Sequence, residues 1–126
     1  MMPAEFAEHQ GTIMCWPARA DIWQGNLVEA EAAFAELANT IAQFEPVTMF
    51  VDPKYIEHAT ALCGPGVSLS TSPLDDSWAR DSGPTYVHQP DGSLVGLDFV
   101  FNGWGNKFHP HDADAVFAQQ VTKLFG

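Results

Sequence analysis

The stretch LVEAEAAFAELANTIAQFEPVTMFV, residues 27–51, contains a helix signal followed directly by a strand signal. Its apolar residues recur at spacings of three and four, which is typical of the buried stripe of an amphipathic helix. The stripe consists of Leu27, Ala30, Phe34, Leu37, Ile41 and Phe44, and Glu29, Glu31, Glu36 and Gln43 lie off it. Pro46 ends the predicted helix, and residues 47–51 (VTMFV) form a short apolar run. We therefore expect a helix that packs against a buried strand.

Similar signals lie on both sides of this stretch. Residues 12–16 (TIMCW) form a short apolar run stopped by Pro17, and residues 67–69 form another, so both are predicted strands. The predicted helix boundaries are Asn26 as an N-cap, Asp52 with Pro53 as a second helix start, and Gly64 as the end of that helix. Strands that alternate with helices in this way indicate an α/β architecture.

The second half of the sequence adds a hairpin and a last helix. Residues 85–88 and 94–101 are predicted strands joined by a Pro-Asp-Gly turn, and residues 102–112 are a predicted loop. Asp112 or Asp114 is expected to cap a helix that runs to about Leu124. Its expected apolar side is Val116, Phe117, Val121 and Leu124. The hairpin makes the expected sheets mixed, and a helix that feeds no further strand predicts a truncated segment of a single domain, residues 1–126.

The charge balance narrows the classes of partner. The 126 residues contain 5 Lys and Arg against 16 Asp and Glu, a net charge of −11. Binding to nucleic acid or to anionic membrane surfaces depends on clustered cations, so we expect neither partner. An acidic surface instead attracts amines, guanidines and metal ions. The sequence shows neither a signal-peptide pattern nor a long apolar run, which predicts a cytoplasmic location.

The segment DDSWARDSGP, residues 75–84, combines three carboxylates with an arginine and a tryptophan on a predicted connection. Such polar clusters on loops commonly supply functional side chains. The alternative interpretation is structural: Asp75 and Asp76 cap a turn, Arg80 pairs with one of them, and Trp78 lies in the core. The residues alone leave both interpretations open.

Two other segments are weaker candidates. In FNGWG, residues 101–105, two glycines flank Trp104 and allow either a pocket wall or a tight bend after a strand. In HPHDAD, residues 109–114, imidazoles and carboxylates resemble a metal-ligand set. Pro110 makes that spacing awkward and Asp112 is better used as a helix cap, so we expect no metal.

The cysteines and histidines give no nucleophilic site. Cys15 lies in an apolar strand, where burial raises a thiol pKa, and Cys63 lies at a helix C-terminus, which does not stabilise a thiolate. We expect both to be reduced and structural. His9, His58 and His88 are expected to be isolated, and no Ser, His and Asp set can be assembled.

Four segments together resemble a known family. MPAEFAEHQGTIMCWPARADIW, FEPVTMFV, DDSWARDSGPT and GLDFVFNGWGNKF resemble, in this order, the N-terminal part of the agmatine deiminases, which belong with the Porphyromonas-type peptidylarginine deiminases. SWARDSGP is the most specific of these motifs. The resemblance implies about two modules of a pentein-type propeller, a ring of five α/β modules around a central site.

The resemblance also implies a reaction. Agmatine deiminases hydrolyse agmatine to N-carbamoylputrescine and ammonia through an amidino-cysteine intermediate, without metal or organic cofactor, as a step of putrescine and polyamine metabolism. Asp81 would then grip the substrate guanidinium through paired charged hydrogen bonds. Trp78 would wall the substrate slot, and the further pocket candidates are Trp104, Asn102, Asp21 and Trp23.

One departure from the family limits what this chain is expected to do. The catalytic histidine with its partner aspartate, and the nucleophilic cysteine, belong to modules outside these residues, so we expect the isolated chain to be inactive and to self-associate through exposed module faces. A peptidylarginine deiminase segment, and a noncatalytic interaction or metal-binding module, remain as alternatives.

Overall fold

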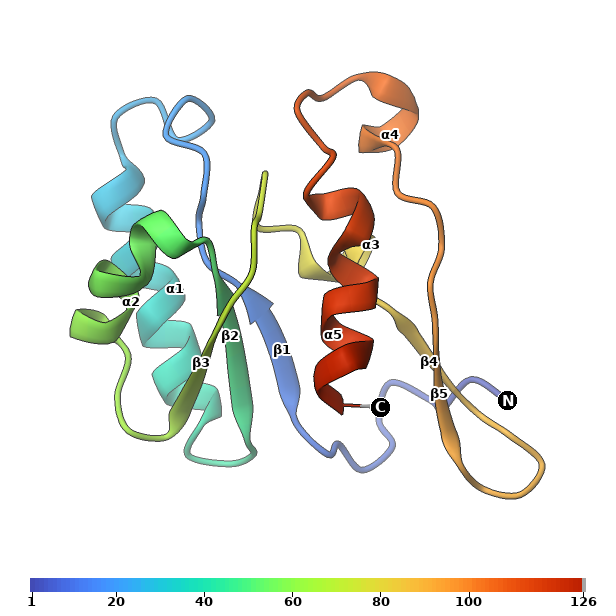
Figure 1. The fold of residues 1–126 in the computed structure, drawn as a ribbon. Helices are drawn as coiled ribbons and strands as arrows, with labels where there is room; N and C mark the ends of the chain where they lie inside the picture. Colours follow the sequence, from blue (N-terminus) through green and yellow to red (C-terminus); the bar gives the residue numbers. More distant parts are fainter. Residues whose placement is uncertain (126) are drawn as a thin grey trace.

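The computed structural model describes residues 1–125, and its centre is a parallel three-stranded sheet of order β1-β2-β3 (Figure 1). The strands are β1 (Thr12–Cys15), β2 (Val47–Val51) and β3 (Val67–Thr71). Thr12 pairs with Val47, and Val47 pairs in turn with Val67, so all three strands start at one edge of the sheet. This confirms the predicted mixed α/β class and its three strands.

Helices cover both faces of this sheet (Figure 1). α1 (Leu27–Ile41) and α2 (Ile56–Leu62) pack on one face, where Ala38, Ala59, Trp16 and Met49 are fully buried. α5 (Phe117–Phe125) covers the other face, where the ring of Phe117 meets Phe50 edge-on at 5.1 Å. Because β2 is buried on both sides, its sequence is apolar almost throughout.

The second sheet is an antiparallel hairpin of β4 (Thr85–His88) and β5 (Leu94–Leu97), and α5 contacts β5. β5 ends at Leu97, four residues earlier than predicted. Short elements complete the chain: η1 (Pro53–Tyr55), α3 (Ala79–Ser82), α4 (Gly103–Asn106) and η2 (Asp114–Val116). No helix within residues 1–125 combines the length and the apolar character that crossing a bilayer requires.

Two expectations for α1 are wrong. The helix ends at Ile41, so Phe44 lies beyond it with 83% of its surface exposed, and Leu37 is 53% exposed. Glu31 is only 3% exposed, although the periodicity placed it on the solvent side. Its carboxylate accepts a hydrogen bond from Trp16 Nε1 over 3.1 Å and contacts His58 Nδ1 at the same distance. A buried carboxylate is tolerated because it has such partners. The expectation that His58 is isolated is therefore wrong.

Of the predicted helix caps, the structure confirms Asp52, whereas the Asn26 side chain makes no cap hydrogen bond. The Asp52 carboxylate accepts from the backbone N–H of Lys54, which confirms this cap, although η1 precedes α2. Asn26 occupies the N-cap position of α1 without a side-chain cap hydrogen bond. α2 ends at Leu62, just before the predicted Gly64.

The last helix differs from the prediction at its start and on its exposed side. Asp114 is buried inside η2, and Ala113 holds the N-cap position in place of either predicted aspartate. Phe117 and Val121 are buried as expected, whereas Val116 is 41% exposed and Leu124 is 53% exposed. The segment that was predicted to be a loop, residues 102–112, contains the single turn α4.

Candidate active site

The segment before α3 is fixed to the beginning of η2 by hydrogen bonds that two aspartates, Asp75 and Asp114, accept from the backbone of the opposite segment. Asp114 Oδ1 accepts from the N–H of Asp75 (2.9 Å) and of Asp76 (3.3 Å), while Asp75 Oδ2 accepts from the N–H of Ala113 (2.7 Å). Asp114 is 3% exposed. Burial, together with the charges of Asp75 and Asp76, raises its pKa to about 6 despite its backbone hydrogen bonds.

The next residue, Asp76, positions the indole of Trp78. Asp76 is buried, and its Oδ2 accepts from Trp78 Nε1 over 3.1 Å while Oδ1 accepts from the N–H of Ser77 over 2.8 Å. Trp78 as a whole residue is 52% exposed. The interpretation of Trp78 as a core residue is therefore wrong. Sequence analysis did not single out Asp76 as a support, and its only signal was a carboxylate two residues before a tryptophan on a turn.

Trp104 is presented by a left-handed turn. The φ angles of Gly103, Trp104, Gly105 and Asn106 are 59°, 54°, 78° and 61°, so the whole of α4 has the unusual hand. The Asn102 carboxamide oxygen closes the turn by accepting from the N–H of Gly105 over 2.9 Å. A left-handed conformation costs a residue with a side chain about 1–2 kcal/mol. Strain of this kind tends to gather at functional sites.

Trp104 contacts both the ring of Trp78 and the carboxylate of Asp81, which is exposed on α3. Trp104 Nε1 donates to Asp81 Oδ1 over 3.1 Å, and the rings of Trp78 and Trp104 are 6.0 Å apart at 88°. Within residues 1–125, Asp81 Oδ2 has no hydrogen bond. The arrangement offers a carboxylate in contact with Trp104 and close to a pair of aromatic rings, which suits a planar cation.

A pocket of about 190 Å³ lies between β1 and residues 77–81 and includes Asp81, Trp78 and Cys15 in its lining. Cys15 is 1% exposed, and burial raises the pKa of its thiol, with further contributions from Asp114 and Asp76. Burial also raises the pKa of Cys63, and both cysteines are unpaired. Neither thiol is activated, in agreement with the structural roles predicted for them.

The structure does not bring the other two predicted substrate residues to Asp81. Asp21 pairs with Arg19, which lowers the Asp21 pKa, and it lines a separate pocket. The ring of Trp23 meets Phe34 edge-on at 6.1 Å. Phe34 lines the pocket of Asp81, so Trp23 packs against a lining residue without lining the pocket itself. Asn102 belongs to the site through its support of the Trp104 turn.

One of the two histidines of residues 109–114, His111, contacts the Trp104 turn. His111 Nε2 lies 3.0 Å from Asn106 Oδ1, and its ring meets Phe101 edge-on. Among the residues that the structure describes, no three His, Cys, Asp or Glu side chains are close enough to hold a metal ion together. The arrangement therefore gives the metal-binding interpretation no support.

Comparison with known proteins gives consistent matches along the chain. The family model for Porphyromonas-type peptidyl-arginine deiminase matches residues 1–126. An agmatine deiminase of Stutzerimonas stutzeri is 46% identical over 107 residues, which cover 84% of this chain and 29% of that protein. One of Ectopseudomonas mendocina is 40% identical over 130 residues, which cover 99% of this chain and 35% of that protein. The chain thus spans about a third of the length of these relatives.

Solved structures agree with the sequence matches. The agmatine deiminase of Enterococcus faecalis superposes with a TM-score of 0.92 at 30% identity, covering 98% of this chain and 35% of that one. A C. jejuni agmatine deiminase with substrate bound superposes with a TM-score of 0.82 at 25% identity, covering 97% and 36%. Sequence and fold together place the chain in the Porphyromonas-type peptidyl-arginine deiminase family.

Proposed function

We propose that these residues form the N-terminal, substrate-gripping part of an agmatine deiminase with a five-module pentein ring. The observation that carries the proposal is the Asp81 carboxylate, whose Oδ1 accepts from Trp104 Nε1, together with the Trp78 ring that packs edge-on against Trp104. Similarity to relatives named agmatine deiminase supports it, as does similarity to a C. jejuni structure with substrate bound. The putrescine-forming role and the cytoplasmic location are proposed from the resemblance and from the sequence.

In this proposal Asp81 neutralises and orients the guanidinium of agmatine. A guanidinium is permanently charged and planar, so a carboxylate can hold it through directed hydrogen bonds while an aromatic ring stacks on its face. The rest of the ring supplies the thiolate, which attacks the guanidinium carbon and displaces ammonia. Water then cleaves the amidino-cysteine to N-carbamoylputrescine and returns the thiol.

The decisive experiment is Asp81→Asn in the full-length protein that contains these residues. The amide keeps the shape and the acceptor for Trp104 but loses the charge that pairs with the substrate, so kcat/KM for agmatine should fall at least a hundredfold. Asp81 is exposed, so the melting temperature should stay within about 2 °C. Asp112→Asn, at another exposed aspartate, is the matched control. Asp81→Asn activity equal to that of the control would contradict the proposal.

Peptidyl-arginine is the alternative substrate, since the family model and a solved structure described as a putative peptidyl-arginine deiminase, at 33% identity, carry that name. Both substrates present the same guanidinium to Asp81. Assaying agmatine and an arginine peptide side by side separates them. Ammonia release from the peptide alone would move the proposal to the second substrate.

A further inference from the structure

Arg80 carries the same chemical group as the proposed substrate and lies next to the carboxylate that would bind it. Arg80 and Asp81 are consecutive residues of α3, and both line the pocket between α3 and β1. An arginine side chain is long and flexible, and its guanidinium forks onto carboxylates in the way a substrate guanidinium does. The Arg80 guanidinium can therefore compete with the substrate guanidinium for the Asp81 carboxylate.

In the structure a third residue holds Arg80 elsewhere. Arg80 Nη2 donates to Glu5 Oε1 over 2.5 Å, and both side chains are mostly exposed. This contact raises the pKa of Arg80 and lowers that of Glu5, and the charge of Asp81 adds to the effect on Arg80. Asp81 is thus close enough to act electrostatically on Arg80 while Glu5 holds its guanidinium.

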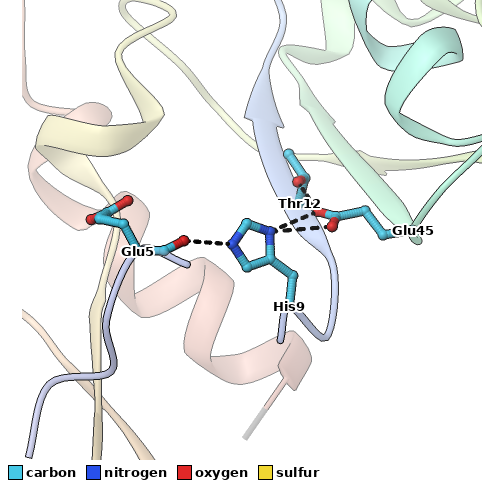
Figure 2. Close-up of polar contacts among 4 residues, drawn as sticks. All are labelled: Glu5, His9, Thr12 and Glu45. Carbon is cyan, nitrogen blue, oxygen red and sulfur yellow. Dashed lines mark hydrogen bonds and ion pairs between the residues drawn. The ribbon is translucent and has the colours of Figure 1, made fainter. Parts of the chain in front are cut away.

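Glu5 is itself held in place through His9 (Figure 2). His9 Nε2 lies 3.3 Å from the backbone oxygen of Glu5, and Nδ1 lies 3.2 Å from Glu45 Oε2. Both partners are acceptors, so both ring nitrogens can donate to them when the imidazole carries its second proton. These two contacts raise the pKa of His9. Thr12 Oγ1 also donates to Glu45, which ties the segment to the start of β1.

We propose that Glu5 keeps the Arg80 guanidinium off Asp81, so that the carboxylate stays available to the guanidinium of the substrate. Glu5 is then a positioning residue that sets apparent affinity. Without it, Arg80 either pairs with Asp81 or leaves an uncompensated positive charge beside a cationic substrate. The inference rests on the proposed function, because Asp81 must bind a guanidinium for the competition to matter.

The test is a set of three variants of the full-length enzyme: Glu5→Gln, Glu5→Gln combined with Arg80→Met, and the control Glu8→Gln. Glu8 is an exposed glutamate of the same segment, so its variant makes the same charge change. Exposed ion pairs contribute only modestly, so Glu5→Gln should raise KM for agmatine roughly two- to fivefold with kcat unchanged. The double variant should return KM to the wild-type value.

A purely structural role for Glu5 would not produce this split between KM and kcat or its repair by removal of Arg80. The inference is overturned if the KM of Glu5→Gln equals that of Glu8→Gln, or if the double variant keeps the raised KM. Wild-type protein that does not hydrolyse agmatine overturns the proposed function and this inference with it. Active wild-type enzyme with either result above overturns the inference alone.

Discussion

Asp75 and Asp114 join two backbone segments through a reciprocal pair of hydrogen bonds, and the two residues are 39 positions apart in the sequence. The N–H of Asp75 donates to Asp114, and the carboxylate of Asp75 accepts from Ala113, just before Asp114. One of the two segments leads through Asp76 to Trp78, and the other begins the helical segment that continues into α5. These hydrogen bonds, called here the Asp75–Asp114 clasp, therefore couple the position of the site to the packing of α5 on the sheet.

The clasp predicts an unusual dependence of stability on pH. The pKa of Asp114 is raised from 3.8 to about 6, so its contribution to stability is present below the lower value and is lost as pH rises through the higher one. The shift corresponds to about 3 kcal/mol at neutral pH. Asp114→Asn keeps the acceptor and removes the buried charge, so it should raise the melting temperature at pH 8 more than at pH 5. Asp112→Asn is the control. If the melting temperature of Asp114→Asn at pH 8 is equal to or lower than that of the wild type, the raised pKa of Asp114 is refuted.

Asp76 should act on the substrate only through Trp78. Asp76→Ala removes the acceptor of the indole N–H, and Trp78→Phe removes the donor; either loss of one hydrogen bond should cost about 1 kcal/mol, or roughly fivefold in kcat/KM for agmatine. In a double-mutant cycle the two effects should overlap rather than add. Strict additivity would mean that the contact does not position the ring.

Two glycines of the left-handed turn should respond differently to alanine. A Cβ on Gly103 would lie 2.5 Å from Phe108 O and 2.7 Å from the His111 ring, whereas a Cβ on Gly105 meets nothing within 4 Å. Gly105→Ala should therefore cost only its backbone strain, about 1 kcal/mol. Gly103→Ala should cost more and weaken agmatine binding further, as measured by thermal melts and KM. Equal effects of the two variants would argue against this packing.

The 126-residue chain alone should not release ammonia from agmatine. Cys15 is buried and the pKa of both thiols is raised, so neither provides a thiolate at neutral pH. Exposed apolar side chains such as Phe99 (64%) and Val100 (92%) should also make it self-associate, which gel filtration would detect. Cys15→Ser and Cys63→Ser are the controls. Turnover that disappears in either variant would contradict the structural role of that thiol.

Periodicity predicted the strands and helices well and the burial of single residues less well. The β2 run is apolar because helices cover both of its faces, and this is visible in the sequence. Glu31 is buried because Trp16 and His58, from other elements, complete its hydrogen bonds. A local pattern cannot contain that information, because the partners lie 15 and 27 residues away in the sequence.

In the candidate site, too, some residues could be identified from the sequence and others could not. Trp78, Asp81 and Trp104 stood out through residue type and family resemblance, and the structure brings them together. Their supports did not stand out. The Glu5 and Arg80 pair spans 75 residues, so its existence depends on the folded path of the chain and not on any spacing. The structural interpretation pairs Arg80 with Asp75 or Asp76 and is wrong on this point, because Arg80 pairs with Glu5.

The handedness of the turn at residues 103–106 makes the two walls of the slot unequal as targets for protein engineering. Trp78 has an ordinary φ of −84°, so side chains of many sizes can be exchanged there without disturbing the backbone. Trp104, at φ 54°, stands where β-branched replacements are disfavoured. A combinatorial library built to admit bulkier guanidines should therefore yield its functional members at position 78, while position 104 limits how far the slot can diversify.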